Sequence, residues 1–148
     1  KAVIPGGSSC PILTAKECED LTLTYESMKA HGTMFGTGCA IIMNEHTDMA
    51  EVLKNLTHFY ADESCGQCTP CREGTAWEDR LMKKILAGKA TVKDLDLMLE
   101  TADNMEGKTI CVFASALAMP VRSFIKKFRE DFEKRLIKNT VSVPETVA

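Results

Sequence analysis

The sequence predicts an α+β fold in which a short strand-containing region precedes a bundle of four helices. Two observations lead to this expectation. More than half of the nine glycines lie before residue 47, where they separate short apolar segments at 2–4, 11–13 and 39–43 that are typical of strands. From residue 47 onward, apolar residues recur every three or four positions, which is the period of an amphipathic helix.

The first region, residues 1–46, is too small to form a stable sheet alone. Residues 39–43 form a continuous apolar run that suits a buried strand, and residues 25–30 suit a short helix closed by Gly32. Three short strands and one helix bury little surface. We therefore expect this region to be part of a small α+β domain whose remainder lies upstream of Lys1. The chain does not start with Met, so we expect it to be a piece of a longer protein.

Four helices are expected in the second region, residues 47–138. Their apolar positions place them at about 47–60, 70–86, 92–105 and 120–136. Thr47 or Asp48 caps the first helix, and Pro120 lies near the start of the fourth. Trp77 is expected in the core, and the short connections favour an up-down arrangement. The polar residues 139–148 are expected to form a disordered tail.

The composition excludes several classes of function. The formal net charge is −3 and the basic residues are scattered, so no nucleic-acid surface is expected. The apolar runs are far shorter than the roughly 20 residues that cross a bilayer, so no direct membrane insertion is expected. Seven cysteines without a secretion signal indicate a reducing compartment, where clustered cysteines bind metal or carry out redox chemistry.

Three of the cysteines, Cys65, Cys68 and Cys71, form a C-x2-C-x2-C motif between the first two helices. One tight loop with this spacing can supply three thiolates to an iron–sulfur cubane, and the fourth comes from elsewhere in the chain. In an up-down bundle, the first and third connections between helices lie at the same end. Cys111 lies in the third connection. The sequence therefore predicts a [4Fe–4S] cluster on these four residues, through which electrons pass.

Alternative interpretations remain open at this stage. Zinc also binds four thiolates, although its usual motif is two C-x2-C pairs. A reactive cysteine or a disulfide is the other alternative. Cys10, Cys18 and Cys39 are separated from one another and are expected to be small buried hydrophobic residues. His58 falls on the polar side of the first helix and is expected in solvent.

The segment at residues 63–74, ESCGQCTPCREG, resembles the NADH-binding, FMN-containing flavoprotein subunit of respiratory complex I, also known as the 51 kDa or F chain. The likeness extends over 2–9, 36–43, 59–60, 107–111 and 120–129. The resemblance implies that residues 1–46 are part of a β-grasp-like domain of the soluble-ligand-binding type. It also implies that Cys65, Cys68, Cys71 and Cys111 hold a [4Fe–4S] cluster that accepts electrons from FMN reduced by NADH.

In that family the FMN and NADH sites belong to an upstream domain with a glycine-rich motif. This chain contains no G-x-G-x-x-G, so we expect a C-terminal module of an NADH:quinone oxidoreductase subunit that is inactive alone. The implied partners are other soluble-arm subunits, namely a thioredoxin-like subunit with a 2Fe–2S cluster and a large multi-cluster subunit. The implied location is the cytoplasm or a matrix-type compartment, peripheral to the inner membrane.

Two further alternatives concern the parent protein. The equivalent subunit of an NAD-linked hydrogenase or formate dehydrogenase carries a similar motif, and a metal could merely stabilise a structural or interaction domain. One segment also departs from the family. Residues 112–121, VFASALAMPV, stand where the family has Ala-Leu-Gly followed by an Ala-rich stretch ending in Trp-Pro-Val. This departure affects the expected surroundings of the cluster and leaves the four ligands untouched.

Overall fold

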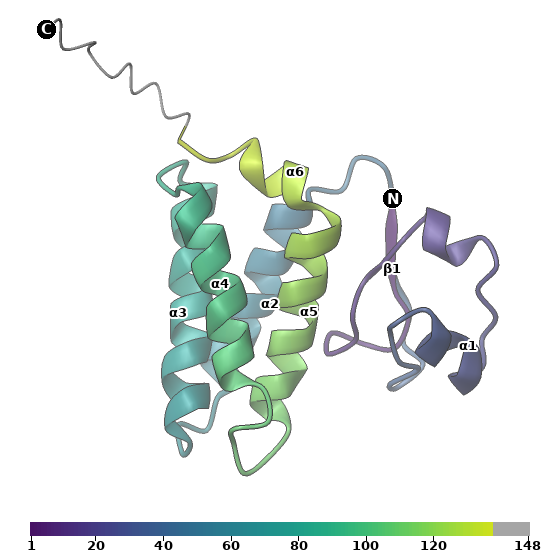
Figure 1. Ribbon diagram of the computed structural model, residues 1–148, viewed down its shortest axis with the longest axis horizontal. Coiled ribbons are helices and arrows are strands. Elements are labelled where there is room, and N and C mark those ends of the chain that lie inside the picture. The colour runs from purple at the N-terminus through teal and green to yellow at the C-terminus, as the bar shows by residue number, and fades with distance from the viewer. Residues whose placement is uncertain (138–148) are drawn as a thin grey trace, which may run out of the picture.

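The computed structural model describes residues 1–137 and confirms the α+β class (Figure 1). The expected tail, 139–148, lies outside the described residues. Three short strands, a 3-10 helix and one short helix come first, and five helices follow. Their bounds are β1 Ala2–Ile4, β2 Leu13–Thr14, η1 Lys16–Cys18, α1 Tyr25–Ala30, β3 Ile41–Met43, α2 Met49–Glu63, α3 Thr69–Leu86, α4 Val92–Met105, α5 Phe113–Lys127 and α6 Arg129–Glu133.

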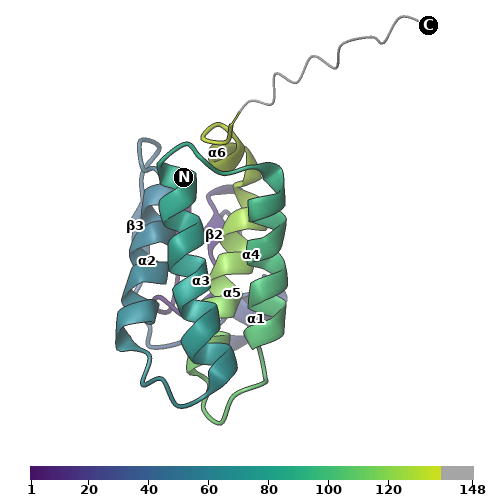
Figure 2. The same cartoon turned by 90° about the vertical axis from the view of Figure 1, so that its left-hand side faces the viewer.

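The helices α2 to α5 lie side by side, with α2 packed against both α3 and α5, and α4 packed against α3 and α5. Figure 2 shows that the α2–α3 and α4–α5 connections lie at the same end, opposite the α3–α4 connection. The expected meeting of these two connections is therefore seen in the structure. None of the helices in residues 1–137 is both long and apolar enough to cross a bilayer.

Local capping explains where two of these helices begin. The Asp48 carboxylate accepts hydrogen bonds from the backbone N–H groups of Ala50 and Glu51, at 2.9 and 3.3 Å, and so caps α2. Thr91 and Asp94 form a reciprocal capping box at the start of α4. Both helices therefore start close to where the sequence predicts them.

The expected start of the fourth long helix near Pro120 is wrong. α5 begins at Phe113, and Pro120 lies inside it. A proline within a helix removes one backbone hydrogen bond and costs about 3 kcal/mol. The alanine-rich turns before Pro120 favour a helix and bury Ala114, Leu117 and Ala118, which offsets this cost. The helix also stops earlier than expected, at Lys127, and the chain turns into the separate helix α6.

Some large apolar residues of the helices, which the sequence pattern places on buried faces, are exposed to solvent. Phe59, Trp77 and Val92 are each about half exposed, so the expectation that Trp77 belongs to the core is wrong. The reason is a close approach of α3 and α4: a Cβ atom added to Gly74 would lie 2.5 Å from the Met105 side chain. Helices this close meet through small residues, and the large indole ring of Trp77 is displaced to the rim of the interface.

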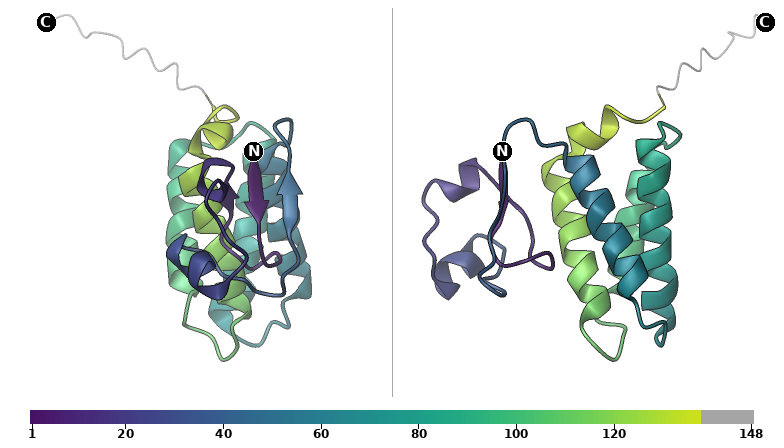
Figure 3. Two further views of the ribbon diagram at one scale, coloured as in Figure 1. Left: turned by 90° about the vertical axis from the view of Figure 1, so that its right-hand side faces the viewer. Right: turned by 180° about the vertical axis from the view of Figure 1, so that it is seen from behind.

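The three strands form an antiparallel sheet of order β2-β1-β3, in which Val3 pairs with Leu13 and with Ile42 (Figure 3). The expectation of a buried strand at 39–43 is wrong. β3 is an edge strand of three residues, in which Ile42 is 78% exposed and only Met43 is buried. An edge strand with one face toward solvent buries only alternate residues.

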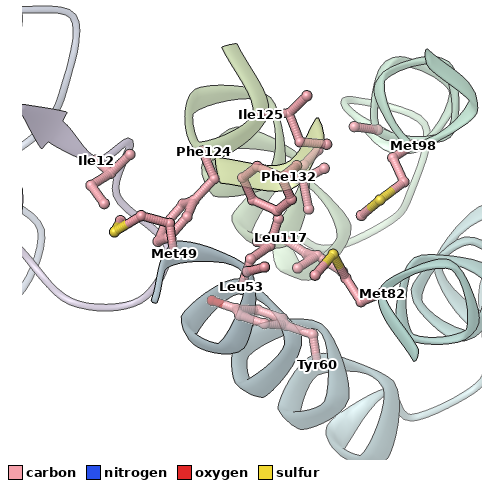
Figure 4. Close-up of a cluster of buried hydrophobic side chains, with 14 of the residues drawn as sticks. Ile12, Met49, Leu53, Tyr60, Met82, Met98, Leu117, Phe124, Ile125 and Phe132 are labelled. Carbon is pink, nitrogen blue, oxygen red and sulfur yellow. The ribbon is translucent and has the colours of Figure 1, made fainter. Parts of the chain in front are cut away.

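The sheet and the helices share one buried core, part of which is shown in Figure 4. Ile12 packs there with Met49 and Phe124. The Ile12 N–H group donates a hydrogen bond to Ser123 Oγ of α5 at 3.0 Å. The division of the chain between residues 46 and 47 stays a prediction, and the buried core extends across it.

Candidate metal centre

Four thiol groups meet at the end of the molecule where the α2–α3 and α4–α5 connections lie. Cys65, Cys68, Cys71 and Cys111 line one cavity of about 190 Å³. Glu63, Thr109 and Phe113 complete its wall. All seven cysteines of the chain are free thiols, and the other three do not line this cavity.

The first loop folds tightly around its three cysteines. Gly66, directly after Cys65, has a φ of +76°, which a residue with a side chain rarely adopts. The Arg72 guanidinium donates a hydrogen bond to the Gly66 carbonyl at 2.7 Å and closes the loop onto the first turn of α3. Cys68 is the N-cap of α3, and Cys71 lies in its first turn. The helix therefore begins one residue earlier than its sequence signals indicated.

The second loop brings Cys111 to the first. α4 ends at Met105, and Gly107 reverses the chain with a φ of +69°. The Thr109 hydroxyl donates to the Cys111 carbonyl at 2.8 Å and holds the next turn. The Ile110 N–H group donates to Cys68 Sγ at a N–S distance of 3.5 Å, which links the two loops directly.

Apart from Glu63 in the wall, the surroundings of the cavity suit an anionic group. Two polar groups lie beside the sulfur atoms. The Ile110 N–H group donates to Cys68 Sγ, and the Ser64 hydroxyl lies 3.4 Å from Cys71 Sγ. The N-terminus of α3, with its partial positive charge, begins at Cys68. Hydrogen bonds to thiolate sulfur and the exposure of the site to solvent are the means by which a protein tunes an iron–sulfur cluster.

An aromatic pair forms the apolar wall. Phe113 lines the cavity, and its ring centroid lies 5.1 Å from that of Tyr60 on α2. The Tyr60 hydroxyl in turn lies 3.2 Å from Ser8 Oγ, within hydrogen-bond distance. Burial raises the pKa of Tyr60, while the hydrogen bond with Ser8 opposes the shift. This contact connects the glycine-rich turn after β1 to the wall of the cavity.

A single metal ion and a cubane require different spacings of four thiols. Within residues 1–137, no three His, Cys, Asp or Glu side chains come close enough together to bind one metal ion. Four thiolates on one zinc ion lie about 3.8 Å from one another, because each Zn–S bond is about 2.3 Å long. In a cubane each thiolate binds a different iron atom, so the sulfur atoms lie farther apart.

Other residues lie differently from what the sequence indicated. Cys10 is buried as expected, Cys18 is half-buried and Cys39 is exposed, so the expectation for Cys39 is wrong. His58 is half-exposed, and its Nδ1 atom lies 3.6 Å from a carboxylate oxygen of Asp79.

Sequence reasoning missed Glu78, which is fully buried in α3. Its spacing of four residues from both Gly74 and Met82, on the face that packs against α4, was the available signal.

The model of the family described as "NADH-ubiquinone oxidoreductase-F iron-sulfur binding region" matches residues 51–135, which is more than half of the chain. The chain belongs to this family. The resemblance at residues 63–74 is thereby confirmed. Members of the NADH-ubiquinone oxidoreductase-F family bind an iron–sulfur cluster in this region, and the four thiols at one cavity fit such a group.

Several relatives carry the family's name. The F subunit of NADH-quinone oxidoreductase from Rhodobacter capsulatus is 43% identical over 136 residues, which is 92% of this chain and 32% of that protein. The mitochondrial NADH-ubiquinone oxidoreductase 51 kDa subunit of Neurospora crassa is 40% identical over 93% of this chain and 28% of that protein. The chain thus spans about a third of the length of the curated relatives that it matches.

A solved structure is also similar. The NAD+-reducing [NiFe]-hydrogenase in its H2-reduced state matches with a TM-score of 0.78 and 30% identity, over 94% of this chain and 24% of that one. Against the family pattern, the departing segment 112–121 builds the start of α5. Ala114 is fully buried, and Phe113 lines the cavity. The segment that departs from the family thus supplies part of the cavity wall beside the four cysteines.

Proposed function

We propose that Cys65, Cys68, Cys71 and Cys111 hold a [4Fe–4S] cluster and that the chain passes single electrons through it. The observation that carries this proposal is that two loops, 40 positions apart between Cys71 and Cys111, place four thiols around one cavity. An up-down four-helix bundle accounts for this meeting, because its first and third connections share one end. The family membership supports the cofactor.

The chain's own residues have distinct roles in this proposal. The four thiolates bind the irons, and the cluster supplies one-electron chemistry when bound. The Ile110 N–H group and the N-terminus of α3 stabilise the negative charge of the site. Phe113 and Tyr60 exclude water from one side, which disfavours additional charge there.

For the parent protein, we infer the role of an NADH:quinone oxidoreductase subunit. In this role electrons come from FMN that NADH has reduced, at sites outside this chain. The partners would be a thioredoxin-like 2Fe–2S subunit and a large multi-cluster subunit, in a cytoplasmic or matrix-type compartment peripheral to the inner membrane. The similarity to the bacterial and mitochondrial NADH oxidoreductase subunits supports this role.

A second candidate is the equivalent subunit of an NAD+-reducing hydrogenase, favoured by the structural similarity to that enzyme. The two candidates differ in what the whole assembly contains. Nickel in the purified assembly, with hydrogen-dependent reduction of NAD+, supports the hydrogenase. NADH oxidation coupled to quinone reduction, without nickel, supports the first candidate.

The ligand set is tested by measuring iron and acid-labile sulfide after anaerobic reconstitution of the full chain. We expect about four irons per chain and a brown colour that dithionite bleaches. Cys111→Ser should lose most of the cluster, because a hydroxyl is a harder and less acidic ligand than a thiol. The matched control, in which Cys10, Cys18 and Cys39 are all changed to Ser, should keep it. A full cluster in the Cys111 variant, or a colourless zinc-containing chain, would contradict the proposal.

A further inference from the structure

The carboxyl group of Glu78 has no role in the site described above, yet it lies in the core. The residue is 0% exposed, and neither of its carboxyl oxygens has a hydrogen-bond partner. Burial raises the pKa of Glu78 well above its ordinary value. An ionised carboxylate without a partner is strongly unfavourable in such a place, so the group retains a proton under conditions in which surface glutamates are charged.

Glu78 lies on the same face of α3 as a proposed cluster ligand. Cys71, Thr75, Glu78 and Met82 are all buried and are separated by four, three and four residues, which places them along one stripe of the helix. The Thr75 hydroxyl, between Cys71 and Glu78, is also buried without a hydrogen-bond partner. Three unpartnered oxygen atoms therefore follow Cys71 into the core of the helical part.

The helices α2, α4 and α5 pack against α3, and the charged and titratable groups at these interfaces have other neighbours than Glu78, although His58 Nδ1 and Asp79 Oδ1 lie 3.6 Å apart without a hydrogen bond. These groups are His58, Tyr60 and Asp62 on α2, Asp94 on α4 and Arg122 on α5, together with Asp79, Lys83 and Lys84 on α3 itself. Across residues 1–137, no Lys, Arg or His forms an ion pair with Glu78. With no ion pair to fix its protonation, Glu78 is open to the influence of the charge of the nearby site.

We propose that Glu78 is a proton-binding site coupled to the cluster, and that it holds its proton more tightly when the cluster carries an additional electron. This inference rests on the proposed function. When a low-potential one-electron donor reduces the cluster, the Glu78 carboxylate takes up part of a proton from solvent for each electron, about half a proton at most for a tenfold change in proton affinity. On reoxidation the O–H bond breaks, and the proton returns to solvent as the electron leaves.

The helix geometry sets the size of the expected coupling. Glu78 lies seven positions after Cys71, which corresponds to about 10.5 Å along an α-helix. At this distance, with an effective dielectric constant of about 20, one elementary charge changes a proton affinity by roughly tenfold. Salt in the solvent screens this interaction little, because the space between the two groups is protein core.

The test is a redox titration of the cluster-loaded full chain, followed by electron paramagnetic resonance, at a series of pH values on both sides of neutrality. We expect a midpoint potential that falls by about 59 mV in total as pH rises through the titration of Glu78, with a steepest slope of about 30 mV per pH unit, and that is flat on either side. Glu78→Gln and Glu78→Met should abolish the slope. Glu73→Gln is the matched control, since Glu73 is exposed and only two residues from Cys71, and it should keep the slope.

Infrared difference spectra between the oxidised and reduced protein give a second readout. They should contain a carboxylic acid band that is absent in Glu78→Gln. A flat potential in the unchanged chain, or the same slope in both Glu78 variants, overturns the coupling. Iron and sulfide are measured first on the same samples, so that a chain without a cluster overturns the proposed function itself. A loaded chain with a flat potential overturns only the role of Glu78.

Discussion

The helical part, residues 49–133, and the N-terminal part, residues 1–46, are stabilised in different ways. In the helical part, four helices of 14 to 18 residues bury one face each against their neighbours. The N-terminal part has strands of two or three residues, and its buried residues join the core of the helices. On its outer side, Leu23, Tyr25 and Ile42 are more than 70% exposed. The N-terminal part therefore depends on the helices for its burial.

The largest expected effect comes from a residue that both parts share. Phe124 is fully buried in α5, close to Ile12 and Met49 (Figure 4). Phe124→Ala should lower the free energy of unfolding by about 3–5 kcal/mol, measured by denaturant titration. Ile42→Ala, on the exposed face of β3, is the control and should change it by less than about 0.5 kcal/mol. Equal losses in the two variants would mean that burial does not distinguish these sites.

Replacing Glu78 tests whether the helical core holds an unfavourable group. Glu78→Met should raise the free energy of unfolding by about 1–3 kcal/mol near neutral pH, because a buried polar group without a partner is lost. The folded-state pKa of Glu78 is raised, so the folded protein binds more protons than the unfolded chain, and stability falls as pH rises above the unfolded value of about 4.3. Unfolding curves at several pH values should show the gain from Glu78→Met shrinking in acid. A gain independent of pH would contradict this reasoning.

A smaller effect is expected at the contact between the two parts. The Ser123 hydroxyl accepts a hydrogen bond from the Ile12 N–H group and donates to the Pro120 carbonyl. Ser123→Ala should cost about 1–2 kcal/mol, because a buried N–H group loses its partner. Amide hydrogen exchange should become faster at Ile12 and in the strands while α2 to α4 keep their protection. Faster exchange throughout the helices would show that the two parts unfold together.

The smallest effect is expected at the ion pair between Glu17 and Lys127, whose charged atoms lie 2.8 Å apart. Burial raises the pKa of Glu17, but the hydrogen bonds from Lys127 and Thr14 outweigh it and leave the pKa lowered. The pair therefore stabilises the fold above the unfolded pKa of about 4.3, and this contribution is lost as pH falls through the folded pKa. Because Glu17 is more than a third exposed, Lys127→Met should cost only about 0.5 kcal/mol. Thermal unfolding at neutral and acid pH measures the difference.

The contrast between the helical part and the N-terminal part also explains which structural features the sequence could predict. Long periodic segments with polar caps, such as the one that starts at Asp48, identify α2 and α4 because their signals are local. The meeting of Cys111 with the triplet followed from the alternation of the helices alone. In the N-terminal part, pairing partners decide the burial, and three-residue strands carry too little pattern to identify an edge. The exposure of Ile42 and Cys39 could not be predicted for this reason.

Within the helical part, sequence periodicity failed where a close contact or an unusual residue decides the structure. The rotation of α3 depends on how closely Gly74 approaches Met105, which no single helix reveals. Pro120 is a helix-start signal that the buried alanines before it outweigh. The burial of Glu78 could not be expected from its residue type, because charged residues are almost never fully buried without a partner.

The four thiols of the cavity differ in how far solvent reaches them. Cys71 is buried and Cys68 half-buried, whereas Cys65 and Cys111 are exposed, one in each loop. Oxidants and alkylating reagents act on the thiolates that they can reach, and sulfinic or sulfonic acids do not revert spontaneously to thiols. In a newly made chain, damage therefore begins with the two outermost cysteines. If the four cysteines hold the cluster as proposed, the time available for inserting it is set by the survival of Cys65 and Cys111, and the depth of Cys71 does not extend it.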